Sequence, residues 1–206
     1  MNPLQQLTEL FAEFPGIGAR QAKRFVYYLL TRNPQYLTNL SNLIRDIRKD
    51  IHTCSSCFRF YERRNTASTL CDICANPNRD TKTLIIVARD VDLENIERTR
   101  AYNGKYFVLG GSVPILEKNP ETRVRSKELI KSVEDRAFDD DLSEIIVAMN
   151  LTAEGENTGE YVEHILKPVV EKNQIKISHL GRGISTGTEL EYSDSETIKN
   201  ALQNRQ

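Results

Sequence analysis

Four cysteines form two Cys-x-x-Cys pairs, Cys54 with Cys57 and Cys71 with Cys74, and the sequence contains no other cysteine. Each pair can place two thiolates on one small ion, and two pairs complete the tetrahedral shell that zinc prefers. The alternative, two disulfide bonds, requires an oxidising compartment, and residues 1–30 contain no basic-then-apolar signal peptide. The spacing therefore predicts one structural Zn²⁺ ion held by all four cysteines.

A second candidate site is the segment 14–20, Phe-Pro-Gly-Ile-Gly-Ala-Arg, which lies between two amphipathic patterns. Gly16 and Gly18 allow the backbone to turn tightly and to approach a ligand closely. The amides at the start of the following helix can hold a phosphate oxygen, helped by the helix dipole. Three basic residues in the first turns of that helix could add contacts to the same backbone: Arg20, Lys23 and Arg24. The pattern favours a helix-hairpin-helix that binds DNA phosphates without reading sequence, over an ordinary helix connection with solvated basic residues.

The elements around the hairpin are predicted from the spacing of apolar residues. Helical spacing in residues 4–14, 19–32 and 37–51 predicts three helices, with Asn33-Pro34 ending the second. The cysteine pairs follow the third helix.

After Asp80, short apolar runs alternate with amphipathic stretches. The apolar runs predict buried strands at residues 84–88, 106–109, 144–148 and 175–177. The stretches between them predict helices at residues 92–100, 126–137 and 156–172. Such alternation implies a mainly parallel sheet covered by helices, with a domain boundary near residues 78–83 and a polar tail after Leu202.

Composition restricts the class of protein. The chain has 206 residues, 39% hydrophobic content and a net charge of -1, which argues against a uniformly basic DNA-packaging protein. No run approaches the roughly 18 apolar residues of a membrane span, so a cytoplasmic location is expected. Residues 1–80 hold 11 Lys and Arg against 7 Asp and Glu, whereas residues 81–206 hold 17 against 22. The imbalance is consistent with a polyanionic partner for the first part, although imbalances of this size also arise by chance.

The order of these parts resembles the bacterial RecR family of recombination mediator proteins. Residues 14–24 resemble its hairpin motif, and residues 71–80 are similar to its second zinc knuckle. Residues 104–111 and 150–158 resemble two signatures of its Toprim domain, and residues 181–191 resemble its C-terminal motif. The resemblance covers nearly the whole chain.

The resemblance implies an α+β multidomain fold in four parts: a helix-hairpin-helix DNA-binding region (1–52), a four-cysteine zinc finger (53–80), an α/β Toprim domain with a mainly parallel sheet (81–180) and a C-terminal assembly segment (181–206). It also implies a non-enzymatic DNA clamp in the cytoplasm at the nucleoid, assembled as a ring-like homotetramer. Its implied partners are RecO and RecF, with which it helps to load RecA on single-stranded DNA. Glu154 and Glu156 are then candidates for the contact with RecO.

Three positions depart from the family pattern. Arg20 stands where the family usually has a DNA-contacting lysine. Residues 58–70 make the segment between the cysteine pairs 13 residues long, which is longer than usual. Loop length adds closure entropy only slowly, so the longer segment is expected to be tolerated. Ala88 stands after the first Toprim strand, where the family normally has glutamate.

Catalysis is the main alternative to a binding role. An active Toprim enzyme needs a glutamate after its first strand and an Asp-x-Asp after a later one, to hold magnesium beside a phosphodiester. This chain has Ala88 and Asn150-Leu151-Thr152 at those places. We interpret Asp90 and Asp92 as residues of a helix amino terminus, where acidic side chains complement the dipole. The alternatives left open are a metal-dependent Toprim nuclease or primase and a monomeric zinc-ribbon adaptor that binds protein.

Overall fold

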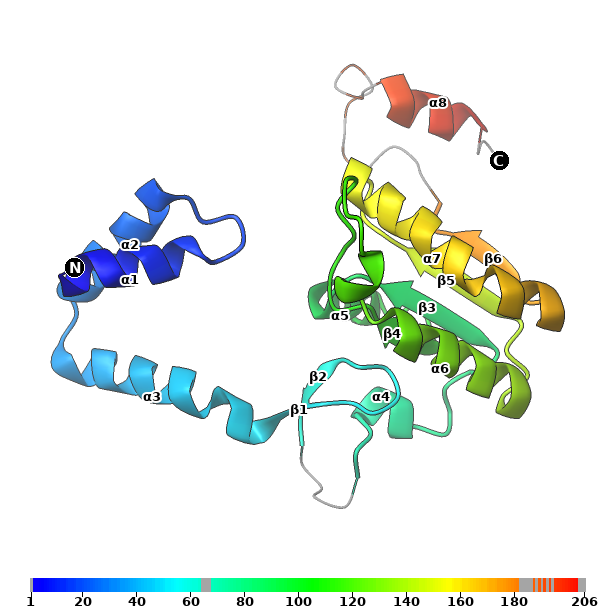
Figure 1. The fold of residues 1–206 in the computed structure, drawn as a ribbon, viewed down its shortest axis with the longest axis horizontal. Helices are drawn as coiled ribbons and strands as arrows, with labels where there is room; N and C mark the ends of the chain where they lie inside the picture. Colours follow the sequence, from blue (N-terminus) through cyan, green and yellow to red (C-terminus); the bar gives the residue numbers. More distant parts are fainter. Residues whose placement is uncertain are drawn as a thin grey trace. The chain divides into compact units, whose positions relative to one another are not determined.

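The computed structural model describes residues 2–63, 68–181, 187, 189, 191, 193 and 195–203. The chain divides into two compact units, Met1–Ile51 and His52–Gln206, and Figure 1 shows their elements coloured along the sequence. No helix of the described residues combines the length and the apolar character that crossing a membrane requires.

The first unit consists of three helices: α1 (Pro3–Ala12), α2 (Ala19–Leu30) and α3 (Pro34–Asp50). The α1 and α2 helices form an antiparallel hairpin, in which the rings of Phe11 and Phe25 meet edge to face at 6.1 Å. Ala22 and Val26 of α2 are buried in this contact. The three helices predicted from apolar spacing are therefore present.

The prediction that Asn33-Pro34 ends the second helix was wrong. The α2 helix ends at Leu30, and Asn33-Pro34 instead begins α3. The Asn33 side chain accepts a hydrogen bond from the Tyr36 amide at 2.8 Å, and Pro34 occupies the first helical position. Proline fits there because its missing N–H would have no partner inside the helix.

The second unit is built on a four-stranded sheet with the order β4-β3-β5-β6. The strands are β3 (Thr83–Val87), β4 (Lys105–Val108), β5 (Glu144–Ala148) and β6 (Lys176–His179). Every neighbouring pair is parallel, as predicted. The chain moves from β3 to β4 on one side and then returns to β5 on the other. The strand order therefore reverses beside β3, at the kind of switch point where open α/β sheets place their binding crevice.

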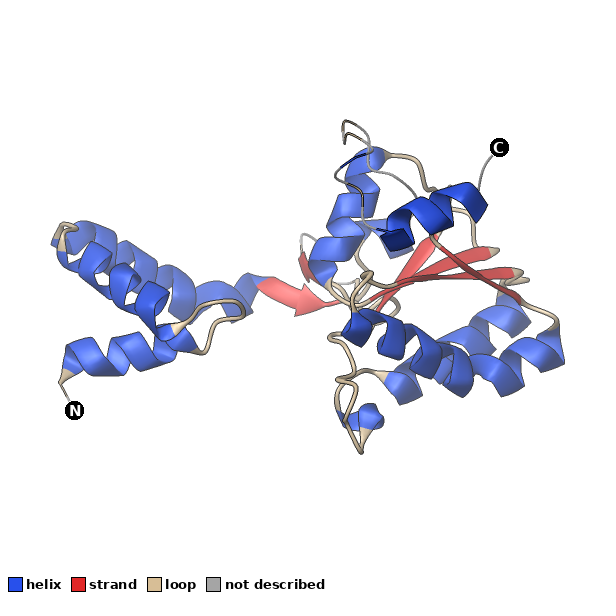
Figure 2. Ribbon diagram, turned by 90° about the horizontal axis from the view of Figure 1, so that it is seen from above, coloured by secondary structure: helices blue, strands red, loops and turns tan. Residues whose placement is uncertain are grey.

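Helices lie on both faces of this sheet (Figure 2), and the cysteine knuckles pack against one of the two faces. Leu84 and Ile86 of β3 belong to the core formed with α6 (Ser126–Asp139) and α7 (Ala153–Asn173). Ile85 and Val87 point to the opposite face, where the core includes Leu93 of α5 (Asp90–Thr99) and three of the cysteines. Side chains alternate along a strand, so one apolar run supplies both cores.

The remaining elements are short and were not predicted. Strands β1 (Ile51–Thr53) and β2 (Phe60–Glu62) form a two-stranded sheet, and helix α4 (Asp72–Ala75) follows the second cysteine pair's first member. The 3-10 turn η1 (Pro120–Thr122) precedes α6, and α8 (Ser195–Gln203) lies in the C-terminal part. The motif at residues 181–191 falls largely outside the described residues, because only 181, 187, 189 and 191 are placed.

Candidate metal centre and nucleic-acid hairpin

The four cysteines converge on one point. Their sulfur atoms all lie within 4.8 Å of one another, and the Sγ atoms of Cys57 and Cys71 are 3.6 Å apart. Four sulfurs around a zinc ion at about 2.3 Å would be about 3.8 Å apart, so the cluster has the dimensions of a tetrahedral thiolate site. A disulfide would need a sulfur separation of about 2.05 Å, and all four thiols are free. The donor set and its geometry therefore fit a single zinc ion.

The backbone around the first pair forms a tight knuckle. The Phe58 amide donates to the Cys54 carbonyl at 3.0 Å, and the Cys54 amide donates to the Arg59 carbonyl at 2.9 Å. Phe58 has φ of 61°, a left-handed conformation that is costly for a bulky side chain. Its half-buried ring packs against that of Phe107, with the ring centres 5.2 Å apart, and this contact favours the observed conformation.

A backbone amide of the second cysteine pair donates a hydrogen bond to a sulfur atom of the first. The Cys71 amide donates to the Sγ of Cys54 at 3.4 Å. Hydrogen bonds with the Cys57, Cys71 and Cys74 thiols hold the pKa of Cys54 below its ordinary value, and the bond to Cys54 raises the pKa of Cys57. Four thiols this close cannot all ionise without repulsion, which a dication would relieve.

The cysteine cluster is part of the core of the sheet unit. Cys54, Cys57 and Cys71 are fully buried and belong to the same hydrophobic cluster as Tyr106 and Val108 of β4. The Val108 amide, on the edge strand β4, donates to the Cys57 carbonyl at 2.8 Å, so a hydrogen bond joins the first knuckle directly to the sheet. The metal centre and the sheet therefore form one packed body.

The hairpin turn has the backbone that the sequence predicted. Gly16 has φ of 76°, in the left-handed region that favours glycine, and the Ile17 amide donates to the Phe14 carbonyl at 3.0 Å. Gly18 is the N-cap of α2, and no side chain caps that end of the helix. The first amides of α2 are therefore available to an anion.

The three basic residues lie on the first two turns of α2. Arg20, Lys23 and Arg24 are all exposed. The Arg24 guanidinium contacts the Gln21 side chain at 3.4 Å, and the Lys23 ammonium lies 6.0 Å from the ring centre of Tyr27. No acidic residue stands in the first turn of this helix, so the amino end of α2 keeps an uncompensated positive charge.

Comparison with known proteins agrees with this arrangement. Residues 4–48 match the family described as "RecR, helix-hairpin-helix", residues 82–181 match the Toprim domain and residues 183–206 match "RecR, C-terminal". The chain is 34% identical to the recombination protein RecR of Lactobacillus acidophilus, over 98% of this chain and 96% of the relative. It is 36% identical to that of Bifidobacterium animalis subsp. lactis, over 98% of this chain and 94% of the relative.

The chain belongs to the RecR family.

In this RecR-family chain, the two positions where an active Toprim enzyme needs magnesium-binding carboxylates are uncharged. Ala88 follows β3 and Asn150 follows β5, on the two strands that flank the switch point. The carboxylates of Asp90 and Asp92 are engaged with backbone, since Asp90 accepts from the Phe60 amide at 2.7 Å and Asp92 from the Arg89 amide at 3.0 Å. Among the described residues, the four cysteines are the single group of three or more potential metal ligands that converge.

The two glutamates assigned to partner binding lie in the first turn of α7. Both are exposed, and the Glu154 carboxylate accepts a hydrogen bond from the Ser112 hydroxyl. Glu156 lines a hollow of about 740 Å³ together with Glu160 and Glu163. The amino-terminal half of α7 therefore presents carboxylates beside an open groove, which is the charge expected of a surface for a basic partner.

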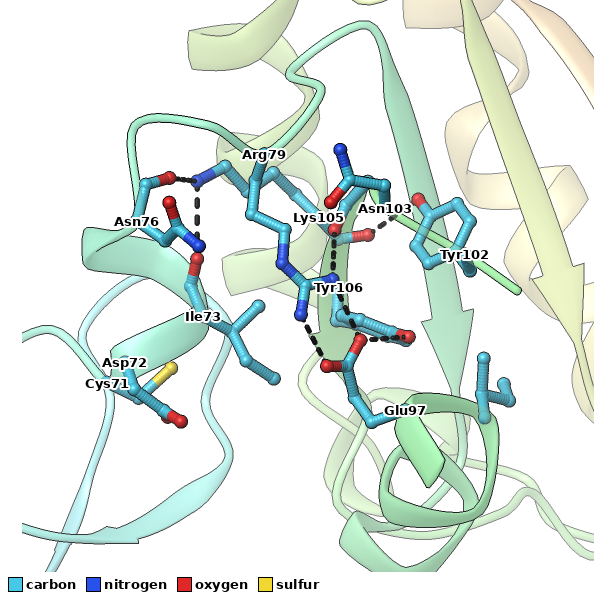
Figure 3. Close-up of polar contacts among 12 residues, drawn as sticks. Cys71, Asp72, Ile73, Asn76, Arg79, Glu97, Tyr102, Asn103, Lys105 and Tyr106 are labelled. Carbon is cyan, nitrogen blue, oxygen red and sulfur yellow. Dashed lines mark hydrogen bonds and ion pairs between the residues drawn. The ribbon is translucent and has the colours of Figure 1, made fainter. Parts of the chain in front are cut away.

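Sequence reasoning missed the polar network beside the metal centre (Figure 3). The Arg79 guanidinium pairs with the Glu97 carboxylate, donating from Nη1 to Oε1 at 2.8 Å. The Tyr106 hydroxyl donates to the same Oε1 at 2.7 Å. Burial acts to raise the pKa of Glu97, but the bonds from Arg79 and Tyr106 outweigh it and hold that pKa below its usual range. Arg79 follows the last cysteine by five positions, a spacing that carries no structural signal by itself.

Proposed function

We propose that this chain is a non-enzymatic, DNA-binding mediator of recombinational repair. The observation that carries the proposal is the positively charged amino end of α2, with Gly16 and Gly18 in the turn before it, in a chain related end to end to RecR proteins. The backbone amides and the basic side chains contact DNA phosphates and not base edges. Sequence specificity is therefore not expected.

The four cysteines hold one Zn²⁺ ion in this proposal. The converging thiols and their burial in the core support a structural role, because a closed four-thiolate shell leaves no position for a substrate. The ion fixes the two knuckles against the edge of the sheet and supplies no chemistry to DNA.

The sheet unit acts as a partner-binding platform and not as a nuclease or primase. Ala88 and Asn150 supply no charged ligand for magnesium, and Asp90 and Asp92 are held by backbone amides. The carboxylates of Glu154 and Glu156 support docking of a basic partner, which we propose to be RecO, with RecF as a second partner. In this role the chain works in the cytoplasm at the nucleoid, and helps to load RecA on single-stranded DNA as a ring-like homotetramer.

The hairpin assignment is tested by reversing its charge. Arg20→Glu combined with Lys23→Glu removes two phosphate contacts, so the slope of log affinity against log salt should flatten by about 1.5 to 2. Affinity for single-stranded and duplex oligonucleotides is measured by fluorescence anisotropy between about 50 and 200 mM salt, a range in which counterion release changes affinity strongly.

A matched control reverses two charges elsewhere. Lys167→Glu with Lys172→Glu alters two exposed residues in the carboxyl half of α7 and changes the net charge equally. This variant should keep the wild-type salt slope. Equal slopes for the hairpin variant and wild type, in chains with the same solution mass, would reject the hairpin as the DNA contact.

A further inference from the structure

Lys105 is a charged residue buried in the sheet unit. It is the first residue of β4, the edge strand that faces the cysteine knuckles, and it is 6% exposed. A buried ammonium requires partners that replace its lost hydration. Its partners therefore indicate why a lysine occupies this position.

All three partners of the Lys105 ammonium are backbone carbonyls of the second cysteine knuckle. The Nζ atom donates to the carbonyls of Cys74 and Asn76, each at 3.1 Å, and to that of Ile73 at 3.4 Å. An ammonium has three protons, so these contacts use its whole donor capacity. One of the three acceptors is the backbone of a metal-binding cysteine.

The carbonyls of Ile73 and Cys74 need such a partner because α4 has only four residues, whereas the Asn76 carbonyl also accepts from the Arg79 amide at 3.4 Å. The single turn of α4 leaves the last carbonyls without amides inside the helix, and a cation at that end is also favoured by the helix dipole. Lys105 therefore supplies, from the sheet, the hydrogen bonds that the short helix cannot make itself.

The start of β4 is shaped to bring Lys105 to this point. A Cβ on Gly104 would lie 2.2 Å from both the Thr83 Oγ1 and the Tyr102 hydroxyl, so any side chain here would have to displace both groups. The Tyr102 hydroxyl donates to the Lys105 carbonyl at 2.9 Å, and Arg79 Nη1 donates to the Gly104 carbonyl at 3.3 Å (Figure 3). Both carbonyls at the start of the strand, those of Gly104 and Lys105, are thus held by hydrogen bonds.

We propose that Lys105 is a positioning residue of the metal centre, holding the Cys71–Cys74 knuckle in the geometry that closes the four-thiolate site. This inference rests on the proposed binding of zinc. A zinc ion with four thiolates carries a net charge of about -2, so the nearby ammonium also offsets that excess charge. Groups in this outer position orient the ligands, and their loss typically weakens metal binding about 10- to 100-fold.

The test is the zinc affinity of Lys105→Met, measured on the full chain by competition with a chromophoric chelator. We expect affinity to fall about 10- to 100-fold relative to wild type. Lys131→Met is the matched control: Lys131 lines the same hollow of about 650 Å³ but is exposed on α6, so its loss should leave affinity unchanged. Lys105→Arg keeps the charge and the donors and should recover part of the loss.

Cobalt(II) spectra separate positioning from general destabilisation. Lys105→Met should shift the thiolate-to-cobalt and d–d bands, because the Cys71–Cys74 pair is no longer held in place. Leu129→Ala, in the core on the other sheet face, should lower stability without shifting them. If Lys105→Met fails to fold without added metal, excess zinc should restore folding by mass action, since binding is weakened and not abolished.

The outcomes distinguish this inference from the proposed function. A wild-type chain that binds no zinc would overturn the metal assignment itself. Wild-type zinc binding with unchanged affinity and cobalt bands in Lys105→Met would overturn the role of Lys105 alone. Failure of excess zinc to restore an unfolded Lys105→Met would also count against it, because the lysine would then serve folding and not the metal.

Discussion

Single residues around the cysteine cluster hold it through contacts with parts of the chain that are distant in sequence. The Cys-x-x-Cys spacing, with no signal peptide to favour disulfides, predicted that the four cysteines share one site, and their sulfur atoms do converge. Lys105 and Arg79 were missed, since their partners are backbone carbonyls and a carboxylate that only the folded sheet brings near. Phe58 was also missed, because a left-handed phenylalanine contradicts its local preference and depends on packing against Phe107.

Glu97 gives the sheet unit a specific dependence on pH. Its pKa is lowered in the folded chain, so its contribution to stability is complete above its ordinary value of 4.5 and is lost as pH falls through the folded pKa. Glu97→Gln removes a charged partner of Arg79 and should lower the free energy of unfolding by about 2 kcal/mol at pH 7. The difference in the free energy of unfolding between variant and wild type should become smaller as pH falls below 4.5.

Urea unfolding of both chains from pH 7 to pH 3.5 measures this difference, in which the acid sensitivity that the two chains share cancels. Glu94→Gln serves as the control, because Glu94 is exposed on the same helix. It should change stability little at any pH. If the difference in the free energy of unfolding between Glu97→Gln and wild type stays constant across this pH range, the charge of the Glu97 carboxylate does not stabilise the fold.

Elements of the second unit followed their apolar patterns closely, because β3 and β4 are buried on both faces and α6 and α7 each pack one face against the sheet. The predicted strands at 84–88 and 144–148 lie within one residue of β3 and β5. Short elements carried no such pattern, and α4 depends on the cysteine cluster and Lys105 instead of periodicity. At Asn33-Pro34 one pair of residues is compatible with a helix end or a helix start, and only the Tyr36 contact decides between them.

The start of α7 depends on a glycine that the helix period does not explain. A Cβ on Gly155 would lie 2.1 Å from the Asn150 carbonyl oxygen, whereas a Cβ on Gly159 would make ordinary contacts of 3.7 and 3.8 Å with Val147 and Met149. Gly155→Ala should therefore lower the free energy of unfolding by about 2 kcal/mol through overpacking against backbone. Gly159→Ala should be neutral or should raise it by up to about 1 kcal/mol, through helix propensity.

Thermal and urea unfolding of the two glycine variants provide the measurement, each serving as the other's control within one helix. Gly155→Ala should also displace Glu154 and Glu156, which flank it, and so weaken binding of a basic partner. Equal stability of the two variants would mean that the turn at Asn150 can move aside.

The two units of the molecule differ in how far their apolar side chains are buried. The sheet unit encloses two hydrophobic cores, whereas α3 of the first unit has no buried residue along its 17 residues. Leu43, Ile44 and Ile47 on this helix are 71%, 63% and 61% exposed. They recur at the spacing of one helix face, and an apolar stripe of this kind is the expected surface of a subunit contact. The sequence predicted the helix but could not show that nothing within the first unit, as described, buries this stripe.

A second copy of this chain is the partner that we expect on α3. Leu43→Glu with Ile47→Glu places two charges in the stripe and should lower the solution mass from that of the proposed oligomer toward 23.6 kDa, the mass of one chain. Two carboxylates buried without partners in an apolar interface carry a large desolvation cost, which opposes assembly. The mass is measured by light scattering after size-exclusion chromatography, over a range of protein concentrations.

Ser41→Glu with Arg45→Gln is the control, because it changes the net charge equally on exposed positions outside the stripe, and it should keep the wild-type mass. An oligomer that survives the stripe variant unchanged would move the subunit contact away from α3, to the sheet unit or the C-terminal segment.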